Sequence, residues 1–226
     1  MTADGVAVVH HDAAIAGLGP IGSLRAGSLP GFVPTLEAAI ASCKGMVLNV
    51  EVKNSPDEPG YDSEGELASK VVECLSRQAL GKPEDNQSAQ GGWGTRSVPI
   101  GEQGRPGAIN TTDLSCAVVI SSFDLPTLDL VRTRCAHLQT ALVVSVLKDP
   151  AKTVNDAADH GLSGIHPHES QVDAAWLQRA RGAGLSVRVW TVNQPARAVA
   201  LAGLGIDGII TDRVPAIREA LSRLDG

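Results

Sequence analysis

The stretch from Ser186 to Arg213, SVRVWTVNQPARAVALAGLGIDGIITDR, places two short apolar runs on either side of a segment with helical features. The runs Ser186–Val192 and Gly208–Thr211 are apolar on both faces, which is typical of strands in a covered parallel sheet. Between them, Asn193 shortly before Pro195 predicts a helix start. The stretch therefore predicts one strand–helix–strand unit of an α/β fold.

The same unit recurs along the chain. Helix starts are predicted at Asp124 and Asp149, each followed by an early proline, and a capping box is predicted at Ser170 with Asp173. Six such units fit either a doubly wound sheet or a barrel. The absence of a G-x-G-x-x-G motif after the first strand favours the barrel. The further apolar runs are Met46–Val52, Ala117–Ser121, Thr140–Val146 and Ser163–His166.

One segment interrupts this rhythm. Residues from about Lys82 to Asp113 are rich in Gly, Gln, Asn, Ser and Pro and have no apolar period. Such a composition predicts a surface insertion within a single domain that spans residues 1–226. Trp93 is the residue of this insertion that we expect to pack on the domain or contact a ligand.

Composition excludes several classes of function. The formal charge of −6 argues against a nucleic-acid surface, which needs a basic face. No apolar run approaches the roughly 18 residues that span a bilayer, so we expect no membrane span. The first residues lack a cationic stretch followed by an apolar one, which predicts a cytoplasmic protein unless a signal peptide lies in a preceding segment. The four cysteines form no C-x-x-C pair, so a zinc or redox site is not expected.

Polar residues follow the predicted strands, where a barrel builds its active site. Glu51 and Lys53 close the run Met46–Val52 and, at positions i and i+2 of a strand, point to the same side. His11 and Asp12 follow Val6–Val9. A carboxylate can hold a divalent cation, a lysine can pair with a phosphate, and a histidine can protonate a leaving alcohol. These residue types suit metal-assisted phosphoryl chemistry, although a single Glu-x-Lys on a strand is more often structural.

Several motifs resemble those of the glycerophosphodiester phosphodiesterase family. The chain carries DGVAVVHHD at residues 4–12, PTLE at 34–37 and NVEVK at 49–53. These are followed by SSFD at 121–124, VWTVN at 189–193 and GIDGIITDR at 205–213. Any one of these motifs alone is weak, but their order is that of the family and they extend over nearly the whole chain. The resemblance implies a TIM-type (β/α)8 barrel.

The resemblance also implies roles for matched residues. His11 takes the place of a catalytic general acid and base, and Glu51 that of a divalent-metal ligand. Lys53 takes the place of a phosphate contact, and Trp190 lines the substrate pocket. The family hydrolyses small-molecule glycerophosphodiesters to glycerol 3-phosphate and an alcohol, and the expected cofactor is Mg²⁺ or Ca²⁺.

The amino-terminal end departs from the family pattern. Family members begin with an H-R-G strand, an E-N-T helix start and an E-x-D strand, which have no counterpart in residues 1–5. We therefore expect a barrel that lacks its first strand, its first helix and most of its second strand, with two open sheet edges and impaired activity. Two alternatives stay open: a relative that binds phosphodiesters without catalysis, and another TIM-barrel phosphodiesterase, acting on inositol phospholipids or sphingomyelin.

Overall fold

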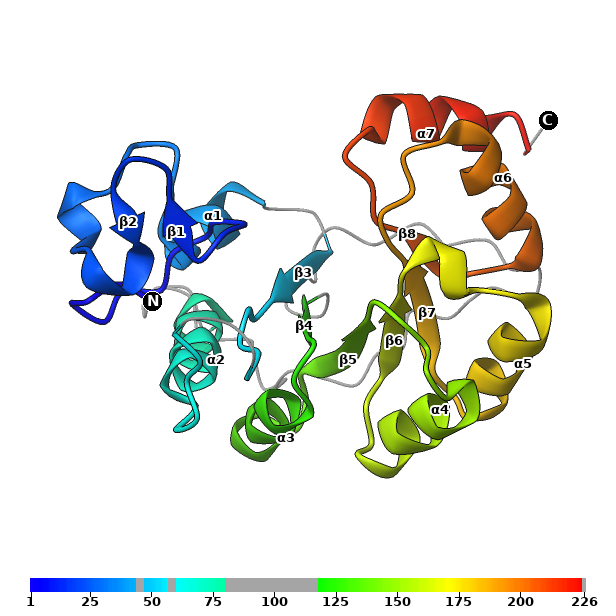
Figure 1. Ribbon diagram of the computed structural model, residues 1–226, viewed down its shortest axis with the longest axis horizontal. Helices are drawn as coiled ribbons and strands as arrows, with labels where there is room; N and C mark the ends of the chain where they lie inside the picture. The colour runs from blue at the N-terminus through cyan, green and yellow to red at the C-terminus, as the bar shows by residue number, and fades with distance from the viewer. Residues whose placement is uncertain (44–46, 57–59, 80–117, 225–226) are drawn as a thin grey trace, which may run out of the picture.

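The computed structural model describes residues 1–43, 47–56, 60–79 and 118–224, so the predicted insertion at 82–113 lies outside the described residues. An amino-terminal lobe precedes the main sheet (Figure 1). The lobe contains β1 (Ala14–Ile15), β2 (Gly19–Pro20), two 3₁₀ turns (Ile21–Ser23 and Ala26–Ser28) and α1 (Leu36–Ser42). The main sheet and its helices comprise β3 (Leu48–Glu51), α2 (Glu66–Ala79), β4 (Val118–Ser122), α3 (Leu125–Arg134), β5 (Gln139–Val144), α4 (Pro150–Asp159), β6 (Gly164–Pro167), η4 (Glu169–Gln171), α5 (Ala174–Gly182), β7 (Ser186–Val189), α6 (Pro195–Leu204), β8 (Gly208–Ile209) and α7 (Val214–Ser222).

The six strands form one parallel sheet in the order β3-β4-β5-β6-β7-β8. The sheet curls, and helices α3 to α6 follow its outer, convex side (Figure 1). This arrangement confirms the predicted α/β fold of the TIM-barrel type. Within the described ranges β3 and β8 are the two edge strands, because no pairing joins them to each other. No helix of these ranges is long and apolar enough to cross a membrane.

Side-chain alternation sorts the strand residues between two faces. Val52, Ile120, Ile165 and Val187 are buried in the main core, which includes residues of all the helices from α2 to α7. Because neighbouring strand residues point to opposite faces, the alternate positions face the concave side. The concave set is Glu51, Ser121, Ala141, Val143, His166 and Arg188, as the strand registers require.

The prediction for Val6–Val9 is wrong. This segment is not a strand of the main sheet, because its pairing is a single antiparallel bridge between Val8 and Thr35. Val8 instead packs against a small separate core of Ile15, Ile21 and Val33 in the amino-terminal lobe. A strand pattern this short depends on a partner strand for its place, and here the partner is the segment that leads into α1.

Helix starts follow the predictions in part. Asp124 and Asp149 cap α3 and α4, accepting hydrogen bonds from the backbone amides of Thr127 at 3.0 Å and Lys152 at 2.9 Å. Two assignments need correction. Gln194, without a side-chain bond, is the N-cap of α6, and Asp173 alone caps α5 while Ser170 lies in the preceding 3₁₀ turn. Asn193 is engaged elsewhere, as described below.

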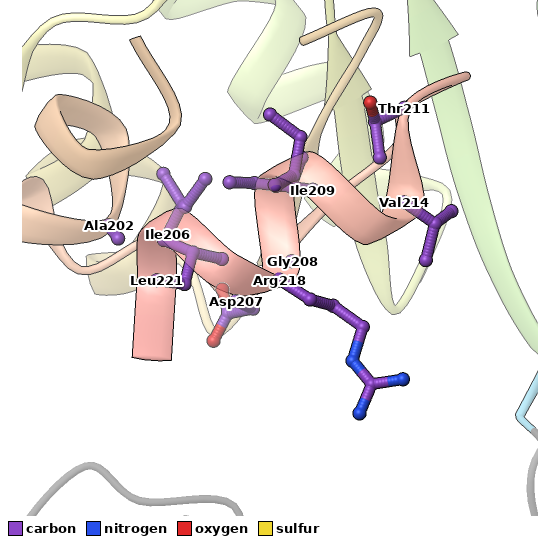
Figure 2. A pocket seen from close by; sticks show the side chains of 10 residues that line it. Ala202, Ile206, Asp207, Gly208, Ile209, Thr211, Val214, Arg218 and Leu221 are labelled. Atoms are coloured by element: carbon purple, nitrogen blue, oxygen red, sulfur yellow. The ribbon is translucent and has the colours of Figure 1, made fainter. Parts of the chain in front are cut away.

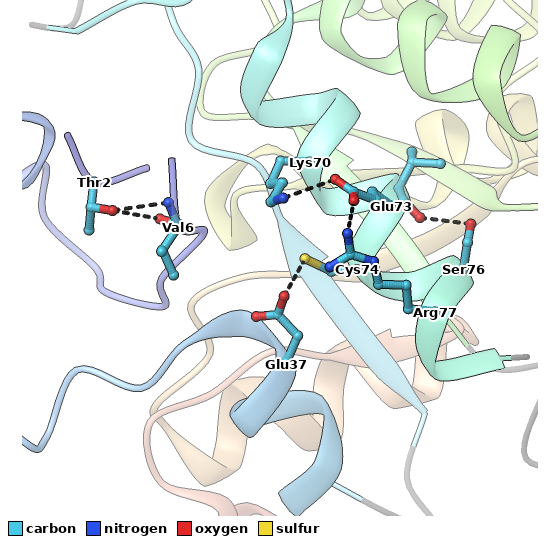
Figure 3. A network of polar contacts seen from close by, with 9 residues as sticks. Thr2, Val6, Glu37, Lys70, Glu73, Cys74, Ser76 and Arg77 are labelled. Carbon is cyan, nitrogen blue, oxygen red and sulfur yellow. Dashed lines mark hydrogen bonds and ion pairs between the residues drawn. The ribbon is translucent and has the colours of Figure 1, made fainter. Parts of the chain in front are cut away.

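Polar contacts join α1 of the lobe to α2 of the barrel (Figure 3). The Cys74 thiol donates to the Glu37 carboxylate at 3.0 Å, and Glu73 pairs with Lys70 at 2.9 Å and also with Arg77. Burial first, and then the Glu37 carboxylate, raise the pKa of Cys74 to about 11. Cys74 is fully buried, so this thiol is a structural group.

Candidate active site at the carboxyl ends of the strands

The first half of the site lies at the carboxyl end of β3. The Lys53 ammonium lies 3.1 Å from the Glu51 carboxylate, and the two side chains are 35% and 33% exposed. The pair is thus accessible to a ligand in solution. Its geometry agrees with the expectation that residues i and i+2 of a strand point to the same side.

His11 and Asp12 of the lobe form a second pair. His11 Nδ1 lies 2.7 Å from Asp12 Oδ1, and the His11 side chain is 85% exposed. The pKa of the Asp12 carboxyl is lowered chiefly by the hydrogen bond from His11, and also by the charges of His11, His10 and Lys53. Lys53 therefore lies within electrostatic reach of Asp12, so the fold brings the two segments together. We call Glu51, Lys53, His11 and Asp12 the polar arm.

The second half of the site is a group of three rings, Phe123, His168 and Trp190, which we call the aromatic arm. Trp190 packs edge-to-face with Phe123 at 5.8 Å between ring centroids and with His168 at 5.3 Å. Its indole N–H donates to the carbonyl of His166 at 2.7 Å. Phe123 is 42% exposed. The Trp190 ring is thus held from three sides while part of the group stays open to solvent.

The two arms meet where β3 and β4 end. The register pairs Glu51 with Ser121, and the backbone amide of Val52 donates to the Ser121 carbonyl at 2.7 Å. The Ser122 hydroxyl then donates to the Val52 carbonyl at 2.9 Å. The next residues, Lys53 and Phe123, therefore begin adjacent loops. The loop that carries Lys53 and the loop that carries Phe123 thus leave the sheet from neighbouring strands.

The concave face of the sheet carries two buried polar residues. Ser121 is fully buried and His166 is 1% exposed. The Ser121 hydroxyl and both ring nitrogens of His166 have no hydrogen-bond partner within the described part of the chain. Burial first, and then the charge of Arg188, lower the pKa of His166 to about 3. His166 is therefore a neutral imidazole at any physiological pH.

Glu51 is the residue expected to bind Mg²⁺ or Ca²⁺. In the described ranges no three His, Cys, Asp or Glu side chains gather into a group that could bind a metal ion. Glu51 offers one carboxylate, and Lys53 engages it. Mg²⁺ is commonly held by one or two carboxylates together with several waters, so Glu51 could supply one ligand, and its metal role stays a prediction.

Two other polar residues at strand ends have structural roles. Asn193 donates to the Asp212 carboxylate at 2.9 Å and accepts from the Asp212 amide and the Thr211 hydroxyl, both at 3.0 Å. These bonds tie the loop after β7 to the loop after β8. Asn193, predicted as a helix start, is thus bonded to the loop after β8 instead.

An apolar hollow also lies between α6 and α7 beside β8 (Figure 2). Ile206, Ile209 and Leu221 supply apolar surface to it, and Asp207 and Arg218 are among its other lining residues. Ile209 packs against the main core and thus lies on the helix-covered side of the sheet. None of the residues that line this hollow belongs to either arm.

Part of the chain is similar to a known protein family. Residues 109–216 match the model of the glycerophosphoryl diester phosphodiesterase family. The match covers slightly less than half of the chain. The aromatic arm lies within the matched residues, and the whole polar arm lies outside them. No curated protein sequence matches the chain.

Solved structures of similar fold cover nearly all of this chain. An Oleispira antarctica phosphodiesterase in complex with the product sn-glycerol-3-phosphate is 21% identical, with a TM-score of 0.71 over 98% of this chain and 82% of its own. A glycerophosphodiester phosphodiesterase from Parabacteroides distasonis is 21% identical, with a TM-score of 0.67 over 99% and 81%. A third, from Thermotoga maritima, is 18% identical, with a TM-score of 0.65 over 99% and 81%. At these identities the likeness establishes a shared fold.

Sequence reasoning assigned no role to three residues that the structure places in the site. Asp12 was noted only as a neighbour of His11, Phe123 only as part of a motif, and His168 only as a residue after a strand. The position of each directly after an apolar run was the available signal. Which of these runs end next to each other is not encoded in their local pattern.

Proposed function

We propose that this protein hydrolyses glycerophosphodiesters to glycerol 3-phosphate and an alcohol. The observation that supports the proposal is the meeting of the two arms at the ends of β3 and β4. There Lys53 and Phe123 begin neighbouring loops, and Lys53 lies within electrostatic reach of Asp12. An anionic diester needs both a cation and a proton donor close to its phosphorus, and the polar arm offers both types of group.

The proposed roles follow from chemistry and position. Lys53 binds a phosphate oxygen in place of its contact with Glu51. Water adds to phosphorus as the bond from phosphorus to the alcohol oxygen breaks, His11 gives its proton to the leaving alcohol, and a proton released by the attacking water restores His11. Asp12 orients the His11 ring through the 2.7 Å contact. Trp190 and Phe123 border the space for the substituent.

A requirement for Mg²⁺ or Ca²⁺, with Glu51 as a ligand, belongs to the proposal as an expectation to be tested. The test is release of glycerol 3-phosphate from sn-glycero-3-phosphocholine by the purified protein, with added Mg²⁺ or Ca²⁺ and with EDTA. We expect turnover that EDTA abolishes. Turnover unchanged by EDTA would exclude the metal role, and no release under any condition would overturn the hydrolase proposal.

A second function, binding of phosphodiesters without catalysis, is favoured by one observation. The described residues contain no group of three metal-ligating side chains, and His11 is 85% exposed. Titration calorimetry separates the two functions: a binder takes up the diester stoichiometrically and releases no product after prolonged incubation.

A further inference from the structure

A short turn after β6 is bonded to the central ring of the aromatic arm. The 3₁₀ turn η4 begins directly after His168, whose ring packs edge-to-face with Trp190 at 5.3 Å between centroids. The Glu169 backbone amide donates to the Trp190 carbonyl at 2.6 Å, and the Trp190 amide donates to the Pro167 carbonyl at 3.1 Å. A shift of this turn would therefore move the Trp190 ring with it.

The side chain of Glu169 does not hold the turn in place. Its Oε2 atom is buried and has no hydrogen-bond partner within the described part of the chain. A buried carboxylate oxygen without a donor is costly, because it has lost its contact with water and gained no bond in exchange. The turn has three residues and thus few hydrogen bonds of its own. A contact from another element has to supply what the turn lacks.

That contact comes from Arg197 of α6, whose guanidinium donates through Nη2 to the Glu169 carbonyl. Arg197 is the third residue of α6, which begins at Pro195. A cation is unfavourable there, because the helix dipole is positive at its amino-terminal end. Arg197 is also half-buried, so its guanidinium has lost part of its hydration. A cation at this position needs compensation, and Glu169 supplies it with a carbonyl oxygen and a negative charge.

We propose that Arg197 is a positioning residue: it holds the turn after β6 so that His168 and Trp190 keep the orientation in which they border the substrate. This inference rests on the proposed function, because it takes the aromatic arm as a wall of the substrate space. Arg197 acts through the carbonyl and amide of Glu169 on Trp190 and touches no reacting atom. Its loss should therefore weaken binding of the diester without changing proton transfer at His11.

Steady-state kinetics separate positioning from chemistry. Arg197→Met keeps the aliphatic stem and removes the donor, so the KM for sn-glycero-3-phosphocholine should rise about tenfold, the effect of one hydrogen bond from a charged group. The kcat should stay within about twofold of wild type, because the polar arm is unchanged. Arg197→Lys keeps a cationic donor for a single carbonyl, so its KM should lie between the two.

The matched control is Arg218→Met, at an exposed arginine of α7, which should change neither constant. An unchanged KM for Arg197→Met, or a fall in kcat as large as the rise in KM, would overturn the inference.

A second measurement does not depend on turnover. In a Trp93→Phe background the remaining tryptophans are Trp190 and Trp176, and Trp176 is 4% exposed in the core. Acrylamide then quenches chiefly the fluorescence of Trp190. Arg197→Met should steepen this quenching, whereas Arg218→Met should leave it unchanged, with urea unfolding as the check that both variants are folded.

The two measurements distinguish the inference from the hydrolase proposal. Equal quenching in the Arg197→Met and Arg218→Met variants would overturn the positioning role whether or not turnover is found. Steeper quenching in Arg197→Met, with no turnover by any form of the protein, would uphold the placement of Trp190 by Arg197 and overturn the hydrolase proposal alone.

Discussion

The two arms of the site are held in different ways. The polar arm consists of side chains that are a third or more exposed and are joined by ion pairs at 2.7 and 3.1 Å. The aromatic arm is fixed by a backbone-directed hydrogen bond and by ring packing above the buried His166. Exposed ion pairs contribute little to folding, whereas buried rings contribute much. We therefore expect substitutions in the polar arm to affect chemistry and those in the aromatic arm to affect stability as well.

The largest expected effect is on turnover in the polar arm. His11→Ala should lower the kcat for glycerophosphodiester hydrolysis by roughly 10²–10⁴, the usual contribution of a general acid–base group. Its unfolding free energy should stay within about 0.5 kcal/mol of wild type, because the side chain is exposed. His10→Ala is the matched control and should do far less, and equal losses from both would show that the wrong histidine is assigned.

The next effect concerns stability in the aromatic arm. Trp190→Ala removes the contacts with Phe123 and His168 and the bond to the His166 carbonyl. Because Trp190 is half-buried, we expect a loss of about 2–3 kcal/mol, below that of a fully buried ring. Urea unfolding measures it, with Phe32→Ala, at an exposed ring of the amino-terminal lobe, as the control that should change little. A loss for Trp190→Ala as small as the control's would mean that the ring is not held as described.

Lowering the pH should reduce the stability of the folded protein, because His166 is buried in its neutral form. Below pH 6.5 the unfolded chain protonates His166, but the buried ring stays neutral down to about pH 3. The unfolded state then binds more protons than the folded state. The free energy of unfolding therefore decreases as the pH is lowered, by up to about 1.4 kcal/mol per pH unit. Between pH 6.5 and 5 this amounts to about 2 kcal/mol.

The variant His166→Asn should flatten this part of the pH dependence when melting temperature is followed from pH 7 to 5. His137→Asn, at an exposed histidine, should keep the wild-type slope. An unchanged slope for His166→Asn would show that His166 is protonated in the folded protein.

The smallest effect is expected for the ion pair of the polar arm. Glu51→Gln should change the unfolding free energy by less than about 1 kcal/mol, since the pair is a third exposed. If Glu51 is a metal ligand, the same variant should raise the metal concentration needed for turnover by at least about tenfold. A stability loss of several kcal/mol would place Glu51 in the structural framework.

The sequence alone predicted the α/β class, the six parallel strands and the helix starts at Asp124 and Asp149. Each of these depends on local chemistry: an apolar run buried on both faces, or a side-chain oxygen that accepts an amide at a helix start. It also predicted that Glu51 and Lys53 point to the same side. For Val6–Val9 and Asn193 the local pattern was misleading, because a partner elsewhere in the chain decides their structure.

Tertiary structure alone decided which strand ends lie together. Pairing of β3 with β4 makes the loops that begin at Lys53 and Phe123 neighbours, although the two residues are far apart in the sequence. Folding of the lobe brings Asp12 within electrostatic reach of Lys53. It also buried His166, whose ring nitrogens have no hydrogen-bond partner among the described residues. The local sequence pattern predicts the face of the sheet toward which a side chain points, but not the residue that lies beside it on the adjacent strand. That neighbour is set by register, and register follows from the packing of the whole sheet and its helices.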